Sequence, residues 1–148
     1  MVPAATKRWS AAEHEAGLAL FVTPEWRNRF RAILAMDDRK RRAQLSKHCW
    51  DRFDARFDRR YARLVEPKVF QRLLPILQAK GAPQMCYVLS TDDDLDRQEL
   101  LLDEVWGLAH DSDQTENFLV SCVPGLLGFY SDHEWYTNRW ILERTEGC

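Results

Sequence analysis

Residues 118–130, FLVSCVPGLLGFY, decide the fold that this sequence predicts. Two apolar runs, Phe118–Cys122 and Leu126–Tyr130, flank the dipeptide Pro124-Gly125. Proline fixes φ near the value required at the first central position of a type II turn, and glycine accepts the positive φ of the second position. The segment therefore predicts a β-hairpin.

Two further apolar runs predict the remaining strands. Met85–Ser90 precedes the hairpin and Asn138–Arg144 follows it. Between the first strand and the hairpin, an acidic loop at 92–96 leads into a short helical pattern over Leu100–Ala109. Four strands with one intervening helix predict a small, largely antiparallel sheet within residues 81–148.

Helix signals dominate residues 1–80. Ser10 and Glu13 form a capping-box pattern ahead of a helix over 11–20. A hydroxyl, a proline and an acid at 23–25 begin a second helix that ends near residue 35. A third helix is expected from about residue 39, and a fourth over 67–80, which ends before Gly81.

Residues 50–64 combine aromatic, basic and acidic side chains in a regular pattern. On a helix, the apolar residues from Trp50 to Leu64 share one narrow arc. Five arginines flank one side of that arc: Arg52, Arg56, Arg59, Arg60 and Arg63. Three aspartates flank the other side. The pattern predicts one continuous helix, with a break near residues 51–54 as the alternative, because Asp and Phe are weak helix formers.

Together these elements predict an α+β fold in a single domain over residues 1–148. The N-terminal helices pack on a small, largely antiparallel β-sheet formed by the C-terminal half. Hydrophobic residues make up 45% of the chain, which suffices for a core. We expect eleven side chains to be buried: Trp26, Phe30, Phe53, Phe57, Leu73, Leu77, Val88, Phe118, Val120, Phe129 and Leu142.

The charges are divided unevenly between the two halves. Residues 1–80 hold 18 of the 21 Lys and Arg but only 9 of the 23 Asp and Glu, a net charge of +9. Residues 81–148 hold 3 basic and 14 acidic residues, a net charge of −11. The formal net charge of −2 hides this split between a basic helical half and an acidic β-rich half. Such an oriented field affects association rates and the choice of partner.

Motifs of the common enzyme classes are missing from the sequence. It has no glycine-rich phosphate loop, and its four cysteines include no CxxC pair, so reduced thiols are expected rather than a zinc site. Cys122 would act as a nucleophile only beside His110 or His133, and core packing is its expected role. We therefore expect neither a catalytic site nor a cofactor.

The acidic loop contains weak metal candidates. Asp92, Asp94 and Asp96 fall at the first three ligand positions of a calcium-binding loop. Arg97 stands where such a loop requires glycine, and Asp103 stands where it requires a bidentate glutamate. We therefore expect a solvated acidic turn and no bound metal.

The acidic half favours a protein-binding module without catalytic activity. Small proteins that neutralise another protein, such as bacterial immunity proteins and antitoxins, often have an acidic surface and no catalytic motif. Asp132, Glu134, Trp135 and Tyr136 combine acids with aromatic rings, which suits a hot spot for a basic partner. Another protein with a basic surface is therefore the expected partner.

The basic half favours an alternative, a nucleic-acid-associated protein that uses residues 39–63. Residues 39–42 carry four cations, and the five arginines of residues 52–63 follow them. Two features oppose this function: the neighbouring aromatic rings suit a core, and the 14 acids of the second half repel a polyanion. Since opposite charges attract within a compact domain, we expect at least one of these five arginines to pair with a carboxylate beyond residue 90.

The hydropathy of the chain predicts its location. No apolar run has the length of a membrane span or of the apolar core of a signal peptide. We therefore expect a cytoplasmic protein without a membrane partner.

Overall fold

The computed structural model of the chain describes residues 8–110, 116–132 and 139–145. They contain a six-stranded sheet in the order β1-β6-β5-β4-β2-β3, in which every neighbouring pair is antiparallel. The strands are β1 (Ala62–Leu64), β2 (Met85–Ser90), β3 (Gln98–Leu101), β4 (Phe118–Val123), β5 (Leu127–Ser131) and β6 (Arg139–Glu143). The predicted α+β fold is thus confirmed. β1 and β3, the two strands at the ends of the sheet, were not predicted.

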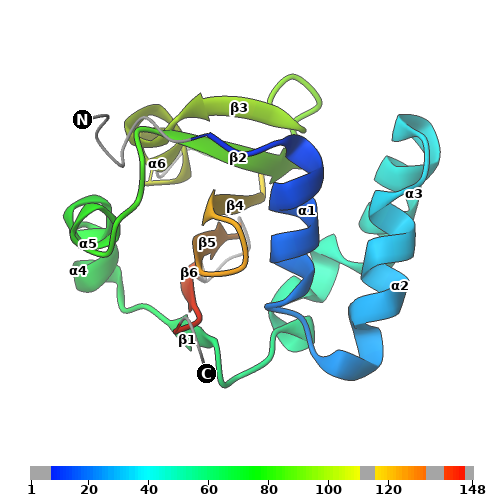
Figure 1. Cartoon of the computed structure of the whole chain (residues 1–148), viewed down its shortest axis with the longest axis horizontal. Helices are drawn as coiled ribbons and strands as arrows, with labels where there is room; N and C mark the ends of the chain where they lie inside the picture. The colour runs from blue at the N-terminus through cyan, green and yellow to red at the C-terminus, as the bar shows by residue number, and fades with distance from the viewer. Residues whose placement is uncertain (1–7, 111–115, 133–138, 146–148) are drawn as a thin grey trace.

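Helices cover both faces of the sheet (Figure 1). One face carries α1 (Ala11–Ala19), α2 (Pro24–Leu34), α3 (Asp38–His48) and the 3₁₀ helix Trp50–Arg56. The other face carries α4 (Pro67–Phe70), α5 (Leu73–Ala79) and α6 (Leu102–His110). Both faces need cover because the central strands carry apolar side chains at nearly every position. None of the helices among the described residues is long and apolar enough to cross a membrane.

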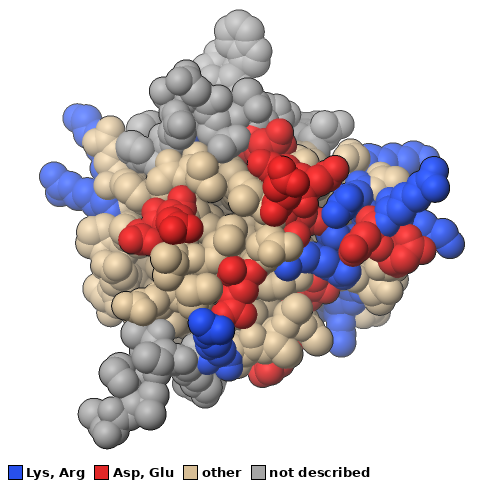
Figure 2. Space-filling view, turned by 90° about the horizontal axis from the view of Figure 1, so that it is seen from above, with Lys and Arg blue, Asp and Glu red and all other residues tan. Residues whose placement is uncertain are grey.

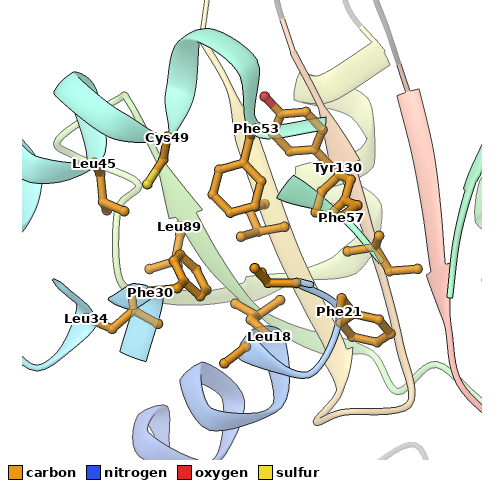
Figure 3. Packing of buried hydrophobic residues seen from close by; sticks show 14 of the residues in the cluster. Leu18, Phe21, Phe30, Leu34, Leu45, Cys49, Phe53, Phe57, Leu89 and Tyr130 are labelled. Carbon is orange, nitrogen blue, oxygen red and sulfur yellow. The ribbon is translucent and has the colours of Figure 1, made fainter. Parts of the chain in front are cut away.

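The core beneath α1–α3 is dominated by aromatic rings (Figure 3). Phe53 contacts Phe30, Phe57 and Tyr130, with ring centroids 5.3–5.5 Å apart. Of the eleven side chains predicted to be buried, ten are buried, and only Trp26 remains partly exposed. The apolar pattern of the sequence therefore identified the core well.

Residues 50–64 do not form the continuous helix that their pattern predicts. The 3₁₀ helix ends at Arg56, and Phe57 already has the extended backbone of a strand, with φ −72° and ψ 141°. The N–H of Asp58 then donates to the carbonyl of Phe21, which joins this segment to the end of α1. Asp and Phe leave this segment with only a weak preference for an α-helix, and tertiary hydrogen bonds outweigh that preference. One consequence is that Leu64 is 54% exposed instead of lying in the core.

Local signals at the ends of elements were predicted more accurately. The N–H of Glu13 donates to Ser10 Oγ, and the N–H of Ser10 donates to the Glu13 carboxylate, both at 3.1 Å, which completes the capping box. In the hairpin, Gly125 has φ 73°, and the N–H of Leu126 donates to the carbonyl of Val123. The turn therefore lies at the predicted Pro124-Gly125 position.

Candidate functional site

A buried ion pair joins the basic half of the chain to the acidic half. Arg41 Nη2 lies 2.6 Å from Asp96 Oδ2, and both side chains are almost completely buried. The other carboxylate oxygen of Asp96 accepts a hydrogen bond from the N–H of Ser90 at 3.0 Å. Arg42 Nε lies 3.7 Å from both Asp93 and Asp96. The turn that follows β2 is thereby fixed to α3.

Arg97 makes the reciprocal connection, from the acidic half to the basic half. Its guanidinium lies 3.0 Å from Glu15 and 2.8 Å from Asp38, and it donates to the carbonyl of Leu34 at the end of α2. Arg97 also has a left-handed backbone, with φ 61°. The hydroxyl of Tyr87 donates to the same Glu15 carboxylate. Burial and this hydrogen bond both raise the pKa of Tyr87.

These contacts determine what the acidic loop can do. Asp96 is committed to Arg41 and Ser90, so its carboxylate does not turn towards the other acids of the loop. Asp92 accepts a hydrogen bond from the N–H of Asp94 at 2.9 Å, as in a compact turn. Within the part of the chain that the structure describes, no three His, Cys, Asp or Glu side chains are grouped as metal ligands.

Four of the five arginines of residues 52–63 have described side chains, and none of these four makes the predicted ion pair. Among the four whose side chains the structure describes, none lies within 4 Å of a described carboxylate beyond residue 90, so the prediction is wrong for these four. Arg60 pairs with Asp58 at 2.7 Å, and this contact lowers the pKa of Asp58. Arg56 stacks on Trp26 and Arg59 on Trp140. The side chain of Arg52 lies outside the described residues, and Arg63 is exposed on β1.

A cluster of cations lies where α2, α3 and the 3₁₀ helix meet. Burial lowers the pKa of His48, and the nearby charges of Arg29, Lys47 and Arg56 lower it further. Among the described residues, no carboxylate lies within 4 Å of these three cations. This neighbourhood is therefore suited to bind an anion.

Acidic side chains gather along β3, the turn before it and the start of α6. Figure 2 shows red acidic groups across this face and blue cations on the side of α3. We call this surface the acidic edge, and its exposed members are Asp93, Asp94, Glu99, Asp103 and Glu104.

The acidic edge also offers an apolar side chain and a groove. Leu101 is 41% exposed. A groove of about 540 Å³ lies beside it, lined by Leu101, Leu102, Asp103 and the segment 82–84. Sequence reasoning missed this surface because it assigned residues 92–96 to a loop and residues 100–109 to a helix, with no strand between them. The dense run of acids was the available signal, but nothing in it marked an edge strand.

The residues first predicted to bind a partner lie elsewhere. Asp132 is buried. Burial lowers the pKa of the neighbouring Arg139, and the charge of Asp132 only partly opposes this shift. Glu134, Trp135 and Tyr136 lie outside the described residues. Trp140, on β6, is buried in the core beneath Arg59.

Nucleophile candidates are buried in the core. Burial raises the pKa of the Cys122 thiol to about 12, so it remains protonated at neutral pH. His14 Nδ1 lies 2.7 Å from Ser121 Oγ. These residues are 107 positions apart, so the sequence around either residue gave no sign of the contact. Both side chains are buried, and the pair joins α1 to β4 instead of facing solvent. The side chain of His110 and all of His133 lie outside the described residues.

Comparison with protein-family models, with curated proteins and with solved structures finds no match to this chain, so its function has to be inferred from geometry and chemistry alone.

Proposed function

We propose that the chain is a non-enzymatic protein-binding module that acts in the cytoplasm and binds a basic partner protein through the acidic edge. Its class would be that of immunity proteins and antitoxins, which act by occupying another protein. The observation that carries the proposal is the concentration of exposed acids around an edge strand.

The charges of the acidic edge are available to a partner. Asp94, Asp103 and Glu104 have no cation within 4 Å among the described residues. Within the described part of the chain, the cation that lies within 4 Å of Glu99 is Arg8, at 3.4 Å, and Arg8 is itself largely exposed. Exposed pairs of this kind contribute about 0–1 kcal/mol and exchange easily for a partner's cation.

Leu101 and the neighbouring groove supply the apolar component that a protein interface needs at its centre. A rim of acids around an apolar centre favours a partner with lysines or arginines around an apolar anchor. Association would be electrostatically steered, so its rate should fall as salt rises.

The test is binding of a synthetic peptide of alternating Lys and Val, measured by titration calorimetry at low salt. The variant Asp103→Lys with Glu104→Lys should weaken binding at least about tenfold, which corresponds to about 1.4 kcal/mol. The matched control is Glu25→Lys with Glu66→Lys, which changes the net charge equally at exposed positions outside the acidic edge. Equal losses in both variants would contradict the proposal, because only net charge would then matter.

A nucleic-acid partner is the second candidate, and one observation favours it. Arg29, Lys47 and Arg56 surround His48 without a described carboxylate nearby. Arg56 Cζ also lies over the Trp26 ring, 4.7 Å from its centroid, and a cation–π contact of this kind does not remove the positive charge that a phosphate would meet.

An electrophoretic shift assay separates the two candidates. Retarded DNA or RNA bands that vanish when Arg56, Arg59 and Arg63 become alanine would favour the nucleic-acid function. Unchanged mobility at low salt would leave the protein-binding function as the better one.

A further inference from the structure

The sheet has two ends, and their chemistry is opposite. β3 forms the acidic edge at one end, and β1 forms the other. Around β1, the exposed charges of Arg63, Lys68 and Arg72 outnumber the single exposed acid Glu66. We call this surface the basic edge. None of its three cations lies within 4 Å of a described carboxylate.

Unpaired backbone groups point outward from β1. In an antiparallel pair, successive residues alternate between facing the partner strand and facing away from it. The N–H of Val65 donates to the carbonyl of Arg139 on β6. By alternation, the N–H and C=O of Leu64 face away from β6, whereas the outward N–H of Ala62 already donates to the carbonyl of Asp58.

The outer side of β3 has the same property. The N–H of Leu102 donates to the carbonyl of Gln84, and the β2–β3 register continues from that pair. By alternation, the N–H groups of Glu99 and Leu101 face away from β2. Each end of the sheet therefore offers hydrogen-bonding groups that no described strand satisfies.

The strand directions fit a further strand pairing. Five successive antiparallel pairings separate β1 from β3, so these two strands run in opposite directions. Because neighbouring strands are rotated by roughly 20–25° from one another, a second copy has to be turned to follow the twist of the sheet. In that orientation its β3 lies antiparallel to β1.

Exposed apolar side chains also lie at both ends of the sheet. The large exposed hydrophobic residues of the described chain are Leu64, Val69, Leu101 and Leu108. Leu64 and Val69 belong to the basic edge and Leu101 to the acidic edge, whereas Leu108 lies near the end of α6, beside Ala109, whose carbonyl accepts from Ser131 on β5 and Arg139 on β6. Leu101 of one copy would thus face Leu64 of the next.

The two strand residues of this set share one face of the sheet. Leu64 pairs with Trp140, whose side chain packs beneath α1–α3. On β2, Tyr87 packs beneath the same helices, and its cross-strand partner on β3 is Glu99. Leu101 lies two residues after Glu99 on β3. Since residues two apart in a strand share a face, Leu64 and Leu101 point to the same side of the sheet.

We propose that the two edges bind each other between copies of this chain, so that β3 of one copy extends the sheet of the next at β1. This inference rests on the proposed function, because it names a second copy as one partner of the acidic edge. Each contact joins different surfaces, so the assembly is head-to-tail and grows beyond a dimer. The strands are short, so the association is weak.

Analytical ultracentrifugation of the full chain from about 10 µM to about 1 mM tests the proposal. The mean mass of the wild type should rise with concentration and should not stop at the dimer. Two charge-reversed variants should each remain monomeric: Arg63→Glu with Lys68→Glu, and Asp103→Lys with Glu104→Lys. Arg39→Glu with Lys40→Glu, on an exposed part of α3, is the matched control and should associate like the wild type.

Mixing the two charge-reversed variants is the decisive experiment. The reversed edges are complementary to each other, and the two unreversed edges remain complementary as well, so the equimolar mixture should associate again. Rescue also shows that both variants are folded. A mixture that stays monomeric, or a wild type that stays monomeric up to about 1 mM, would overturn the proposal.

The Lys-Val peptide separates this failure from failure of the proposed function. A monomeric wild type that still binds the peptide through Asp103 and Glu104 would overturn self-association alone. A wild type that associates without binding the peptide at these residues would overturn the basic-partner proposal in its general form.

Discussion

Replacing Asp96 by alanine should lower the free energy of unfolding by about 3–5 kcal/mol, the usual cost of leaving a buried charge without its partner. The Arg41 side chain is 0% exposed, and Asp96 is its closest partner, at 2.6 Å. Asp38 lies 3.4 Å from the same nitrogen but is 60% exposed, so solvent screens its contribution. The variant also leaves the N–H of Ser90 without its acceptor.

Urea unfolding followed by circular dichroism measures the loss, and thermal unfolding gives a second readout. For a chain of this size, each kcal/mol lowers the midpoint by about 2–4 °C, so a fall of roughly 6–20 °C is expected. Glu143→Ala is the control, because Glu143 pairs with Lys80 at the surface, where each side chain remains at least one-third exposed. That variant should cost about 0–1 kcal/mol.

A double-mutant cycle with Arg41→Met isolates the pair. The single change Arg41→Met leaves the Asp96 carboxylate buried without its cation, so it should also cost several kcal/mol. The double variant removes both charges, so it should be more stable than the sum of the two losses predicts, by about 2 kcal/mol or more. Additive losses, or a cost for Asp96→Ala no larger than the Glu143 control, would refute the reasoning.

Three further predictions concern glycine, backbone strain and pH. Gly17→Ala should destabilise the protein by about 1–3 kcal/mol in urea unfolding, because the new Cβ would lie 2.3 Å from backbone of the hairpin turn. Gly107→Ala, a helical position where nothing lies within 4 Å, should instead stabilise it by about 0.5–1 kcal/mol. In urea unfolding, Arg97→Gly should have a free energy of unfolding about 1 kcal/mol higher than that of Arg97→Ala. Both variants lose the same ion pairs, but only glycine adopts the backbone angle φ 61° without strain. Equal midpoints would show that the left-handed backbone carries no strain. Burial lowers the pKa of His14 below 6.5, so its contribution to stability is present above that pH and is lost as pH falls towards the folded-state pKa. His14→Gln should therefore flatten the fall in unfolding free energy between pH 7 and pH 5, more than His48→Gln does, because His48 is less buried.

Local signals made much of the fold predictable. The capping box at Ser10 and the turn at Gly125 are decided by neighbours within a few residues, and the structure confirms both. The strand at Met85–Ser90 was predictable because its apolar run is continuous. β3 was not, because it begins with Gln98 and Glu99 and forms a strand only through its pairing with β2.

The candidate sites were less predictable, for a physical reason. The charge split predicted ion pairs between the two halves of the chain, and the structure contains such ion pairs. They join Arg41 to Asp96 and Arg97 to Glu15, not the arginines of residues 52–63 to the acidic half. The prediction placed the contact on the arginines of residues 52–63 because it assumed that they lie along one helix. Once that segment forms a 3₁₀ helix and an edge strand, its arginines with described side chains face solvent, aromatic rings or the neighbouring Asp58.

Internal pairing determines which charges remain available for a partner. The ion pairs of Arg41 and Arg97 hold α1 and α3 against the turn after β2, and they neutralise charge at that junction. Among the described residues, the charges left over include the cations around His48 and those at the two ends of the sheet, which are acidic at β3 and basic at β1. Although its net charge is only −2, the protein therefore has negative charge at one end of its sheet and positive charge at the other. Because exposed charges are screened within about 10 Å at 0.1 M salt, that polarity acts at contact distance and during the final approach. The sheet ends are therefore where a partner would be recognised.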